Sequence, residues 1–332
     1  MHNKLNLSKK IITWYDNNRR SLPWRVPFRS PKKLYYRLLS EFMLQQTQVK
    51  TVIPYFNKFR KKINNLDQLS STNEKKILKL WEGLGYYRRA KNLLLTSKIL
   101  VKTHKGKLPN NIEEIRKLPG VGEYTSNILL ALVHNKPAIA IDGNVKRVFH
   151  RLYFGGKKNI NIIDFLKKNK EKFYAEKRNS DFAEALMEFG ALICSAKNPK
   201  CSICKLKNFC KFYKNGKNSI SLTSRVVREK KFNVYCYLDR KDKRMALTNR
   251  NKLGFLKNFY LPSVRQAAKK SKNWNYLCSY KNTISNIKMN IKLYYKFSSK
   301  IPQNFGWYSI SQNKEFIPTF TKKVFNKVLD LY

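Results

Sequence analysis

Apolar residues recur at helical spacing from residue 30 to about residue 206. Leu34, Leu38 and Phe42 are four residues apart, which places them on one face of a helix. Ser30 and Pro31 predict its start, with serine as the N-cap and proline in the first turn. The same periodicity predicts helices over residues 51–62, 74–82, 86–101, 111–117, 123–134, 143–153, 161–173 and 180–193. Short segments rich in Gly and Pro separate them, so this region should be all α, with neighbouring helices packed as hairpins.

The pattern changes after about residue 213. Residues 214–225 are rich in Lys, Asn and Ser, a composition typical of a linker. Residues 319–331 have helical spacing, and apolar and polar positions alternate as in half-buried strands over 232–238, 245–248 and 287–297. We therefore expect a smaller α+β domain after the helical region.

Composition and charge indicate what kind of partner the chain binds. Seventy Lys and Arg against twenty Asp and Glu leave a net charge of +50 on 332 residues, which favours a polyanion, although an A+T-rich genome also encodes abundant lysine. The contents of 42% hydrophobic and 13% aromatic residues exclude a disordered chain. Mean hydropathy is −0.56, and apolar runs such as 128–133 are too short to cross a bilayer.

Four of the six cysteines lie close together in the sequence. The first twenty residues lack the apolar core and cleavage site of a secretory signal, so we expect a cytoplasmic protein. In that reducing compartment the cluster indicates a metal site rather than disulfides: Cys194, Cys201, Cys204 and Cys210. Their spacing suits tetrahedral zinc or an iron–sulfur cubane, and it favours the second because only the middle pair is close. Lysines in the loop could meet phosphates or simply be solvated.

Residues 118–122, LPGVG, join two predicted helices. Glycine permits positive φ and close backbone approach, and the N-terminus of the following helix presents free N–H groups to an anion. Such a hairpin can hold a DNA phosphate without reading sequence. An ordinary tight turn between helices would look the same.

Two carboxylates stand in contrasting settings. Glu41 lies on a mostly apolar helix, where a carboxyl tends to keep its proton. Asp142 precedes a helix that begins near Gly143, a polar setting that favours the charged form. Such a pair could serve as acid and anion in cleaving a glycosidic bond, although an N-cap role alone would also explain Asp142.

Taken together, these motifs resemble the adenine DNA glycosylase family (MutY type) within the helix-hairpin-helix iron–sulfur glycosylase superfamily. The resemblance is collinear over nearly all of residues 14–210. It is carried by the four cysteines and by the segments LPWR (22–25), EFMLQQTQV (41–49), LWEGLGYYRRAKNL (80–93), LPGVGEYT (118–125), IDGNVKRV (141–148) and FAEALMEFGALIC (182–194).

The resemblance implies a mainly α catalytic region and a smaller α+β Nudix-like domain. Residues 29–136 would form a six-helix barrel with the helix-hairpin-helix, and residues 1–28 with 137–215 a helical domain around one 4Fe-4S cluster. Residues 216–228 would be a linker before the Nudix-like domain, 229–332, which recognises 8-oxoguanine. The partner implied is double-stranded DNA with adenine opposite 8-oxoguanine or guanine. The resemblance also implies a monomer that does not bind a membrane.

The resemblance also assigns catalytic roles. Glu41 matches the general acid that protonates the extruded adenine, and Asp142 the carboxylate that stabilises the oxocarbenium-like sugar. Tyr124 stands where lyase relatives carry a lysine nucleophile, so the enzyme should be a monofunctional hydrolase. Asn144 matches a residue that supports the aspartate. The alternatives are a bifunctional glycosylase/lyase for oxidised pyrimidines and an iron–sulfur DNA-binding module without catalysis.

Further positions match residues that contact DNA in the family. Gln46 and Tyr86 match wedges around the 8-oxoguanine, and Arg29 and Glu184 match contacts to the extruded adenine. The remaining DNA contacts would come from Arg88, Gly120, Val121 and Gly122. In the 8-oxoguanine-reading loop the usual Ser-His pair is Ser285 followed by asparagine, which cannot carry a charge near neutral pH. No Nudix hydrolase signature is present, so nucleotide hydrolysis is not expected.

Overall fold

The computed structural model divides the chain into two compact units. Residues 1–80 and 86–223 form the helical unit, and residues 81–85 and 224–332 form the C-terminal unit. The structure describes residues 6–157, 160–216, 228–251, 253, 256, 259–266, 273–284, 287–309 and 317–332.

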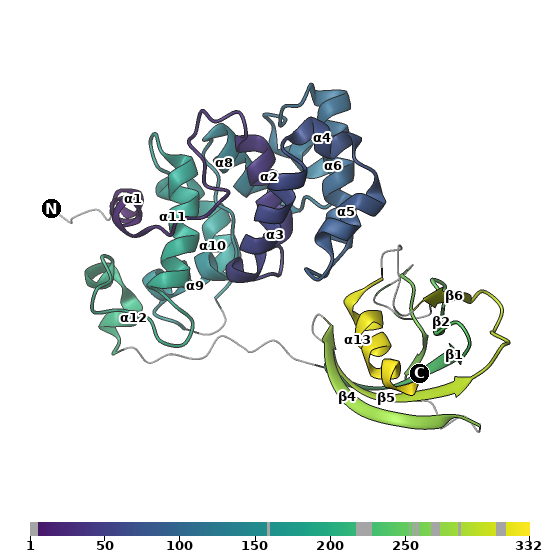
Figure 1. Ribbon diagram of the computed structural model, residues 1–332. Coiled ribbons are helices and arrows are strands. Elements are labelled where there is room, and N and C mark those ends of the chain that lie inside the picture. The colour runs from purple at the N-terminus through teal and green to yellow at the C-terminus, as the bar shows by residue number, and fades with distance from the viewer. Residues whose placement is uncertain are drawn as a thin grey trace. The chain divides into compact units, whose positions relative to one another are not determined.

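The described residues up to 216 are helical (Figure 1). The helices are α1 (Leu7–Asn18), α2 (Lys33–Leu44), α3 (Val49–Lys62), α4 (Leu66–Ser71), α5 (Glu74–Trp81), α6 (Arg88–His104), α7 (Ile112–Lys117), α8 (Glu123–His134), α9 (Gly143–Phe154), α10 (Ile162–Asn169), α11 (Asn179–Leu192) and α12 (Lys211–Lys214). Two 3-10 turns, Lys170–Phe173 and Lys207–Phe209, complete this set. The predicted all-α region is confirmed.

Several predicted boundaries move. The N-cap of α2 is Lys32, because Ser30 and Pro31 form a turn in which the Ser30 carbonyl accepts from the N–H of Lys33 at 3.0 Å. The helix predicted over 161–173 ends at Asn169 and continues as a 3-10 turn. Helices α1, α4 and α12 were not predicted. Of these, α1 and α4 each begin after an asparagine whose side chain caps the first turn, Asn6 and Asn65.

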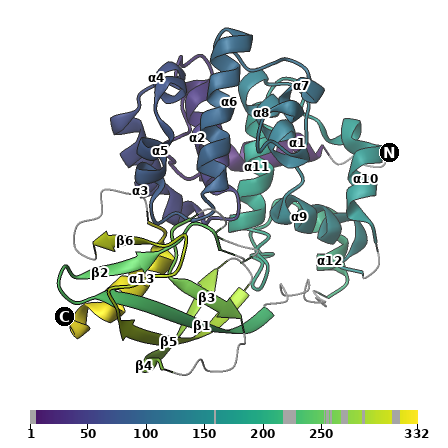
Figure 2. The ribbon, with the colours of Figure 1, turned by 90° about the vertical axis from the view of Figure 1, so that its right-hand side faces the viewer.

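Two groups of helices meet at α8. Helix α2 packs against α3, α6 and α8, while α11 packs against α1, α8 and α9. The second group encloses a core that includes Tyr15, Phe149, Phe182 and Phe189. In Figure 1, α9 and α11 lie on the other side of α8 from α6, and Figure 2 shows α9 beside α11. This arrangement brings the C-terminal half of α2 and the N-termini of α8 and α9 into one region of the helical unit.

The described strands of the C-terminal unit form one mixed sheet. They are β1 (Arg228–Asp239), β2 (Arg244–Leu247), β3 (Ser263–Gln266), β4 (Asn275–Ile284), β5 (Ile287–Phe297) and β6 (Gly306–Ser309). The order is β4-β5-β1-β2-β6, with β3 also paired to β1; β1 and β5 are parallel and the other pairs antiparallel. One helix, α13 (Thr319–Val328), follows, with a 3-10 turn at Leu329–Leu331. The predicted α+β class is confirmed.

The sheet buries one face against α13. Phe232, Val234 and Leu238 of β1 share a core with Phe320 and Val324 of α13, and Figure 1 shows this helix in the curve of β4 and β5. Strands β3, β4 and β6 were not predicted, because their residues lack a clear alternation of apolar and polar positions. Among the described residues no helix is long and apolar enough to span a membrane.

Candidate active site

Glu41 is a buried acid near the C-terminal end of α2. Only 6% of its surface is exposed, and its helix neighbours Leu38 and Phe42 are fully buried. Burial raises the pKa of Glu41 to about 8, against a lowering by Arg37 and with smaller increases from the charges of Glu184 and Asp142. The carboxyl therefore carries its proton near neutral pH, as the apolar helix predicted.

Asp142 is the N-cap of α9. Its Oδ1 accepts the backbone N–H of Val145 at 2.7 Å, and its Oδ2 accepts the Asn144 amide at 2.8 Å. Burial raises the pKa of Asp142 above its usual value, and these hydrogen bonds and the Arg147 charge offset only part of that increase. The two carboxyls thus differ in kind: Glu41 is held neutral by its apolar surroundings, and Asp142 is fixed by donors that favour its charged form.

Tyr124, at the start of α8, completes the cluster. Its hydroxyl donates to the sulfur of Met187 on α11 at 3.2 Å. Burial holds the pKa of the Tyr124 phenol well above its ordinary value, and the charges of Glu41 and Asp142 raise it further. Since both carboxylates act on the same phenol, residues from α2, α8 and the start of α9 form one site.

Asn144 supports Asp142 through a close contact between helices. A Cβ added to Gly190 of α11 would lie 2.7 Å from the Cβ of Asn144 and 3.0 Å from its carbonyl oxygen. Arg147 then joins the two helices, donating to Asn144 Oδ1 at 2.8 Å and to the Gly190 carbonyl at 2.7 Å. The glycine lets α9 and α11 approach, and the approach fixes the amide that orients Asp142.

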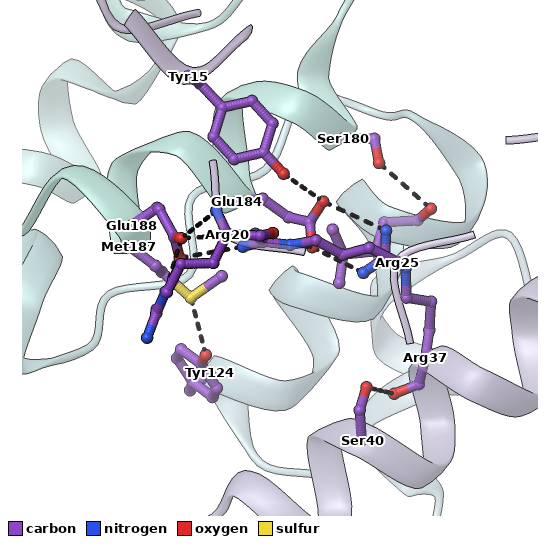
Figure 3. A network of polar contacts seen from close by, with 11 residues as sticks. Tyr15, Arg20, Arg25, Arg37, Ser40, Tyr124, Ser180, Glu184, Met187 and Glu188 are labelled. Atoms are coloured by element: carbon purple, nitrogen blue, oxygen red, sulfur yellow. Dashed lines mark hydrogen bonds and ion pairs between the residues drawn. The ribbon is translucent and has the colours of Figure 1, made fainter. Parts of the chain in front are cut away.

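Glu184 is engaged in a buried ion-pair network (Figure 3). Its carboxylate accepts from Arg37 at 2.7 and 3.2 Å, from Arg25 at 3.1 Å and from the Tyr15 hydroxyl at 2.9 Å. Burial opposes ionisation, yet the charges of Arg37 and Arg25 hold the pKa of Glu184 below its usual value. Four donors occupy the lone pairs of both oxygens, so Glu184 acts in this structure as the anchor for Arg37, one helical turn before Glu41.

A second buried glutamate extends this network along α11. Glu188 accepts from Arg20 at 2.8 Å through each oxygen and from Arg25 at 3.1 Å. Burial raises the pKa of Glu188, but these hydrogen bonds outweigh that effect and lower it to about 2. The ion pairs of Glu188 with Arg20 and Arg25 connect the loop before α2 to α11. In that loop Arg29 is exposed.

The predicted wedge residues share an unusual backbone. Gln46 has φ 57° and Tyr86 has φ 50°, a left-handed conformation that is uncommon outside glycine and clusters at functional sites. Both side chains are exposed. Arg89 links them: its guanidinium donates to the carbonyls of Met43 and Gln45 at the end of α2, and it lies 5.2 Å from the centre of the Tyr86 ring.

The hairpin between α7 and α8 has glycines at its exposed surface. Gly120 has φ 77°, and a Cβ there would lie 2.7 Å from the Asn92 amide. Gly120 and Gly122 are exposed, while Val121 is buried and its N–H bonds the Leu118 carbonyl at 3.1 Å. The glycines, with the first turn of α8 behind them, are therefore the accessible part of this motif. Arg88, at the start of α6, is also exposed.

The four cysteines line a single cavity: Cys194, Cys201, Cys204 and Cys210. Within the described ranges, no three His, Cys, Asp or Glu residues are placed to hold a single metal ion. Four thiols that line one cavity are the kind of donor set that a zinc ion or an iron–sulfur cluster takes. Lys207 is half-buried beside them, and the other loop lysines are exposed.

Helix α9 connects this loop to the active site. Arg147, which holds Asn144, also donates to the Cys194 carbonyl at 2.7 Å. One turn later, Arg151 donates to the carbonyls of Ser195 and Ala196 at 2.6 and 2.8 Å. The helix that Asp142 caps thus also holds the start of the cysteine loop in place through its two arginines.

Several of these residues were not identified from the sequence. Arg37 and Arg147 are charges on helix faces that are otherwise apolar, and Gly190 is a glycine inside a helix; both features were available as signals. Their partners, distant in sequence, were not. Ser285 lies outside the described residues.

Comparisons with known proteins agree with this geometry. Residues 39–172 match the family described as HhH-GPD superfamily base excision DNA repair protein. An adenine DNA glycosylase of Buchnera aphidicola subsp. Baizongia pistaciae is 45% identical over 208 residues, 62% of this chain and 58% of that protein. The adenine DNA glycosylase of Homo sapiens is 33% identical over 60% of this chain and 38% of its own length. The chain thus spans less than two thirds of these relatives.

A solved structure has the same helical fold. The thermostable thymine-DNA glycosylase matches with a TM-score of 0.56 and 28% identity, over 63% of this chain and 95% of that one. The resemblance inferred from the motifs is therefore confirmed for the helical part.

Proposed function

Since residues 39–172 match the HhH-GPD superfamily of base excision DNA repair proteins, we propose that this chain is a monofunctional adenine DNA glycosylase. It would extrude adenine mispaired with 8-oxoguanine or guanine and remove it by hydrolysis. The observation that carries the proposal is the pairing of a neutral, buried Glu41 with Asp142 and Tyr124 in one site. Relatives named adenine DNA glycosylase support the choice of base.

The proposed chemistry uses each carboxyl in one state. Glu41 donates its proton to the imidazole ring of the extruded adenine, which makes the base a better leaving group as the bond from C1′ to N9 breaks. The electron pair of that bond leaves with adenine, and the charged Asp142 stabilises the positive charge on the sugar. Water then adds to C1′, and its released proton restores Glu41.

Tyr124 supports hydrolysis without strand cleavage. A lyase needs an amine to form an imine with C1′, and the phenol of Tyr124 cannot supply one. Burial keeps that phenol neutral. We infer that the hydroxyl packs against the reacting sugar and that the product is an intact strand with an abasic site.

DNA would be held from several sides of the helical unit. The exposed Gly120 and Gly122 and the start of α8 suit a backbone phosphate, and Arg88 a second one. Gln46 and Tyr86, whose side chains are exposed, would wedge into the duplex around the 8-oxoguanine and replace lost base stacking. Arg29 would contact the base, and Glu184 would act through Arg37. The active form would be a monomer in the cytoplasm.

The cofactor proposed is one 4Fe-4S cluster. Cys194, Cys201, Cys204 and Cys210 would hold it as thiolates, and their common cavity supports this. When bound, the cluster supplies structural rigidity to the loop, whose lysines then face phosphates. Arg147 and Arg151 couple that loop to α9.

The C-terminal unit would read the base opposite adenine. We propose a Nudix-like domain over 229–332, joined by a linker at 216–228, with Ser285 in the reading loop. In the helical part, residues 29–136 would be the six-helix barrel and residues 1–28 with 137–215 the iron–sulfur domain. Asparagine after Ser285 should reduce the preference for 8-oxoguanine over guanine, because it cannot carry a charge.

A substrate panel tests this proposal. The full chain, purified without oxygen, is incubated with duplexes that carry adenine opposite 8-oxoguanine, guanine or thymine. We expect free adenine from the first two, and strand breaks only after alkali. Borohydride should trap no covalent adduct. Excision of an oxidised pyrimidine with a trapped adduct would establish the lyase instead, and binding without release of any base would establish a DNA-binding module.

A further inference from the structure

The β-sheet of the C-terminal unit has a second face that differs from its core. Phe232, Val234 and Leu238 of β1 point into the core with α13. Because side chains alternate along a strand, Tyr235 and Tyr237 point to the opposite face. Tyr294 of β5, which pairs in register with Tyr235, lies on that face as well.

Aromatic rings cover the middle of this face. Tyr235 and Tyr294 are stacked, with ring centres 5.3 Å apart and planes at 19°. Trp274 lies edge-on to Tyr235 and to Tyr237, 4.9 Å from each, and Tyr276 lies 5.8 Å from Tyr294. The stacked pair is buried within the cluster, Trp274 and Tyr237 are half-buried, and 53% of Tyr276 is exposed.

Basic side chains surround these rings. The Lys296 ammonium lies 4.7 Å from the Tyr237 ring centre and 4.9 Å from that of Trp274, and the Arg265 guanidinium lies 5.6 Å from that of Tyr235. By strand alternation the exposed Lys231, Lys281 and Lys292 lie on the same face.

The acids of this face do not offset that charge. Glu229 and Asp239 lie at the two ends of β1, and both are ion-paired, with Lys288 at 3.7 Å and with Arg244 at 2.6 Å. The central part of the face, where the rings lie, carries basic and aromatic side chains. A surface of this kind suits an anionic partner that has flat rings of its own.

We propose that this face of the sheet binds single-stranded DNA, with unpaired bases stacked on Trp274 and Tyr276 and phosphates held by Arg265, Lys292 and Lys296. Exposed rings beside cations are the combination that single-strand-binding surfaces use, because every base has a stackable face while only an unpaired base can reach it. An intact duplex keeps its bases inside and would meet only the charges. This binding goes beyond adenine excision and needs no damaged base.

The test measures binding of a labelled single-stranded oligothymidylate to the full chain by fluorescence anisotropy. Removing a ring should weaken binding about 5- to 150-fold in Tyr276→Ala, the factor that corresponds to ~1–3 kcal/mol per stacked base. Tyr276→Phe keeps the ring and loses only the hydroxyl that bonds Ser279 at 2.8 Å, so its affinity should stay within about twofold of wild type. Circular dichroism confirms that both variants are folded.

A matched pair of charge variants tests the phosphate contacts. Lys292→Ala should reduce the slope of log affinity against log salt by about 0.7, the amount expected for one lost phosphate contact on a single strand. The control Lys241→Ala removes an exposed lysine from the turn between β1 and β2 and should leave the slope unchanged.

Two results would overturn the proposal. One is equal affinity of wild type and Tyr276→Ala for the single strand. The other is an equal loss by Tyr276→Ala for a single strand and for an undamaged duplex, since stacking on unpaired bases cannot account for it. Neither result depends on adenine release, so the test stands apart from the proposed activity.

Discussion

Replacing Glu41 by glutamine should stabilise the folded protein while it destroys the proposed acid. Burial raises the pKa of Glu41 to about 8 from an ordinary value of 4.5. Below pH 4.5 the carboxyl is neutral in both the folded and the unfolded chain and has no linkage effect. Between pH 4.5 and 8 the unfolded chain releases the proton and the folded chain keeps it, so the wild type loses stability as pH rises. Glutamine does not titrate and avoids that loss.

The size of the effect follows from the two pKa values. From pH 5 to pH 8 the unfolding free energy of the wild type should fall by about 3 kcal/mol relative to that of Glu41→Gln. For a helical unit of this size that corresponds to a relative change in Tm of about 6–12 °C. Any cost of burying the amide itself is independent of pH, so it shifts the difference between the proteins without changing its slope.

Differential scanning calorimetry at a fixed scan rate, from pH 5 to pH 8, measures this difference. Glu188→Gln is the matched control, because Glu188 is also buried and lies in the same unit. Arg20 and Arg25 bring the pKa of Glu188 to about 2 against the effect of burial. Its charge therefore stabilises the fold above pH 4.5, and Glu188→Gln should lower Tm at neutral pH.

At neutral pH the two substitutions should change the stability of the same unit in opposite directions. If the Tm difference between wild type and Glu41→Gln stays constant from pH 5 to pH 8, Glu41 is ionised in the folded protein and cannot be a proton donor at neutral pH. A stabilising Glu188→Gln would equally contradict the electrostatic account of the network.

Two further predictions concern positioning. Gly190→Ala should lower Tm and should lower adenine release by about 100-fold in single-turnover assays, because a Cβ 2.7 Å from Asn144 displaces the side chain that supports Asp142. The control Gly143→Ala, with no atom within 4 Å of its Cβ, should leave Tm unchanged. Equal Tm in the wild type and both variants would refute the contact between Gly190 and Asn144. Arg89→Leu should weaken binding to a mispaired duplex more than to a matched one in anisotropy titrations, since it frees the Tyr86 ring and the end of α2. An equal loss of affinity for the two duplexes would assign Arg89 to folding alone.

Local patterns in the sequence were sufficient for much of the fold. Helical periodicity located most of the helices of the helical unit, because their apolar faces are continuous. It failed at α1 and α4, where asparagine caps define the start of a helix, and at α12, which has only four residues. It also failed for β4, whose exposed Tyr276 and half-buried Cys278 interrupt the alternation that would mark a strand.

The candidate site divides in the same way. Glu41 and Asp142 were identifiable because each stands in a local setting that alters its ionisation. Arg37 was not, because its role depends on Glu184, 147 residues away in the chain. Gly190 likewise gains its meaning only from the approach of α9, and that approach is a property of packing.

The most direct test of the central claim is single-turnover release of adenine from an adenine:8-oxoguanine duplex by wild type, Glu41→Gln and Asp142→Asn, each loaded with its cluster. We expect adenine release by the wild type and losses of at least about 100-fold in each variant, because each substitution removes a general acid or a stabilising charge. Anisotropy with the same duplex should show that all three proteins still bind it. Variants that release adenine as fast as the wild type would contradict the assignment of both carboxyls to the reaction.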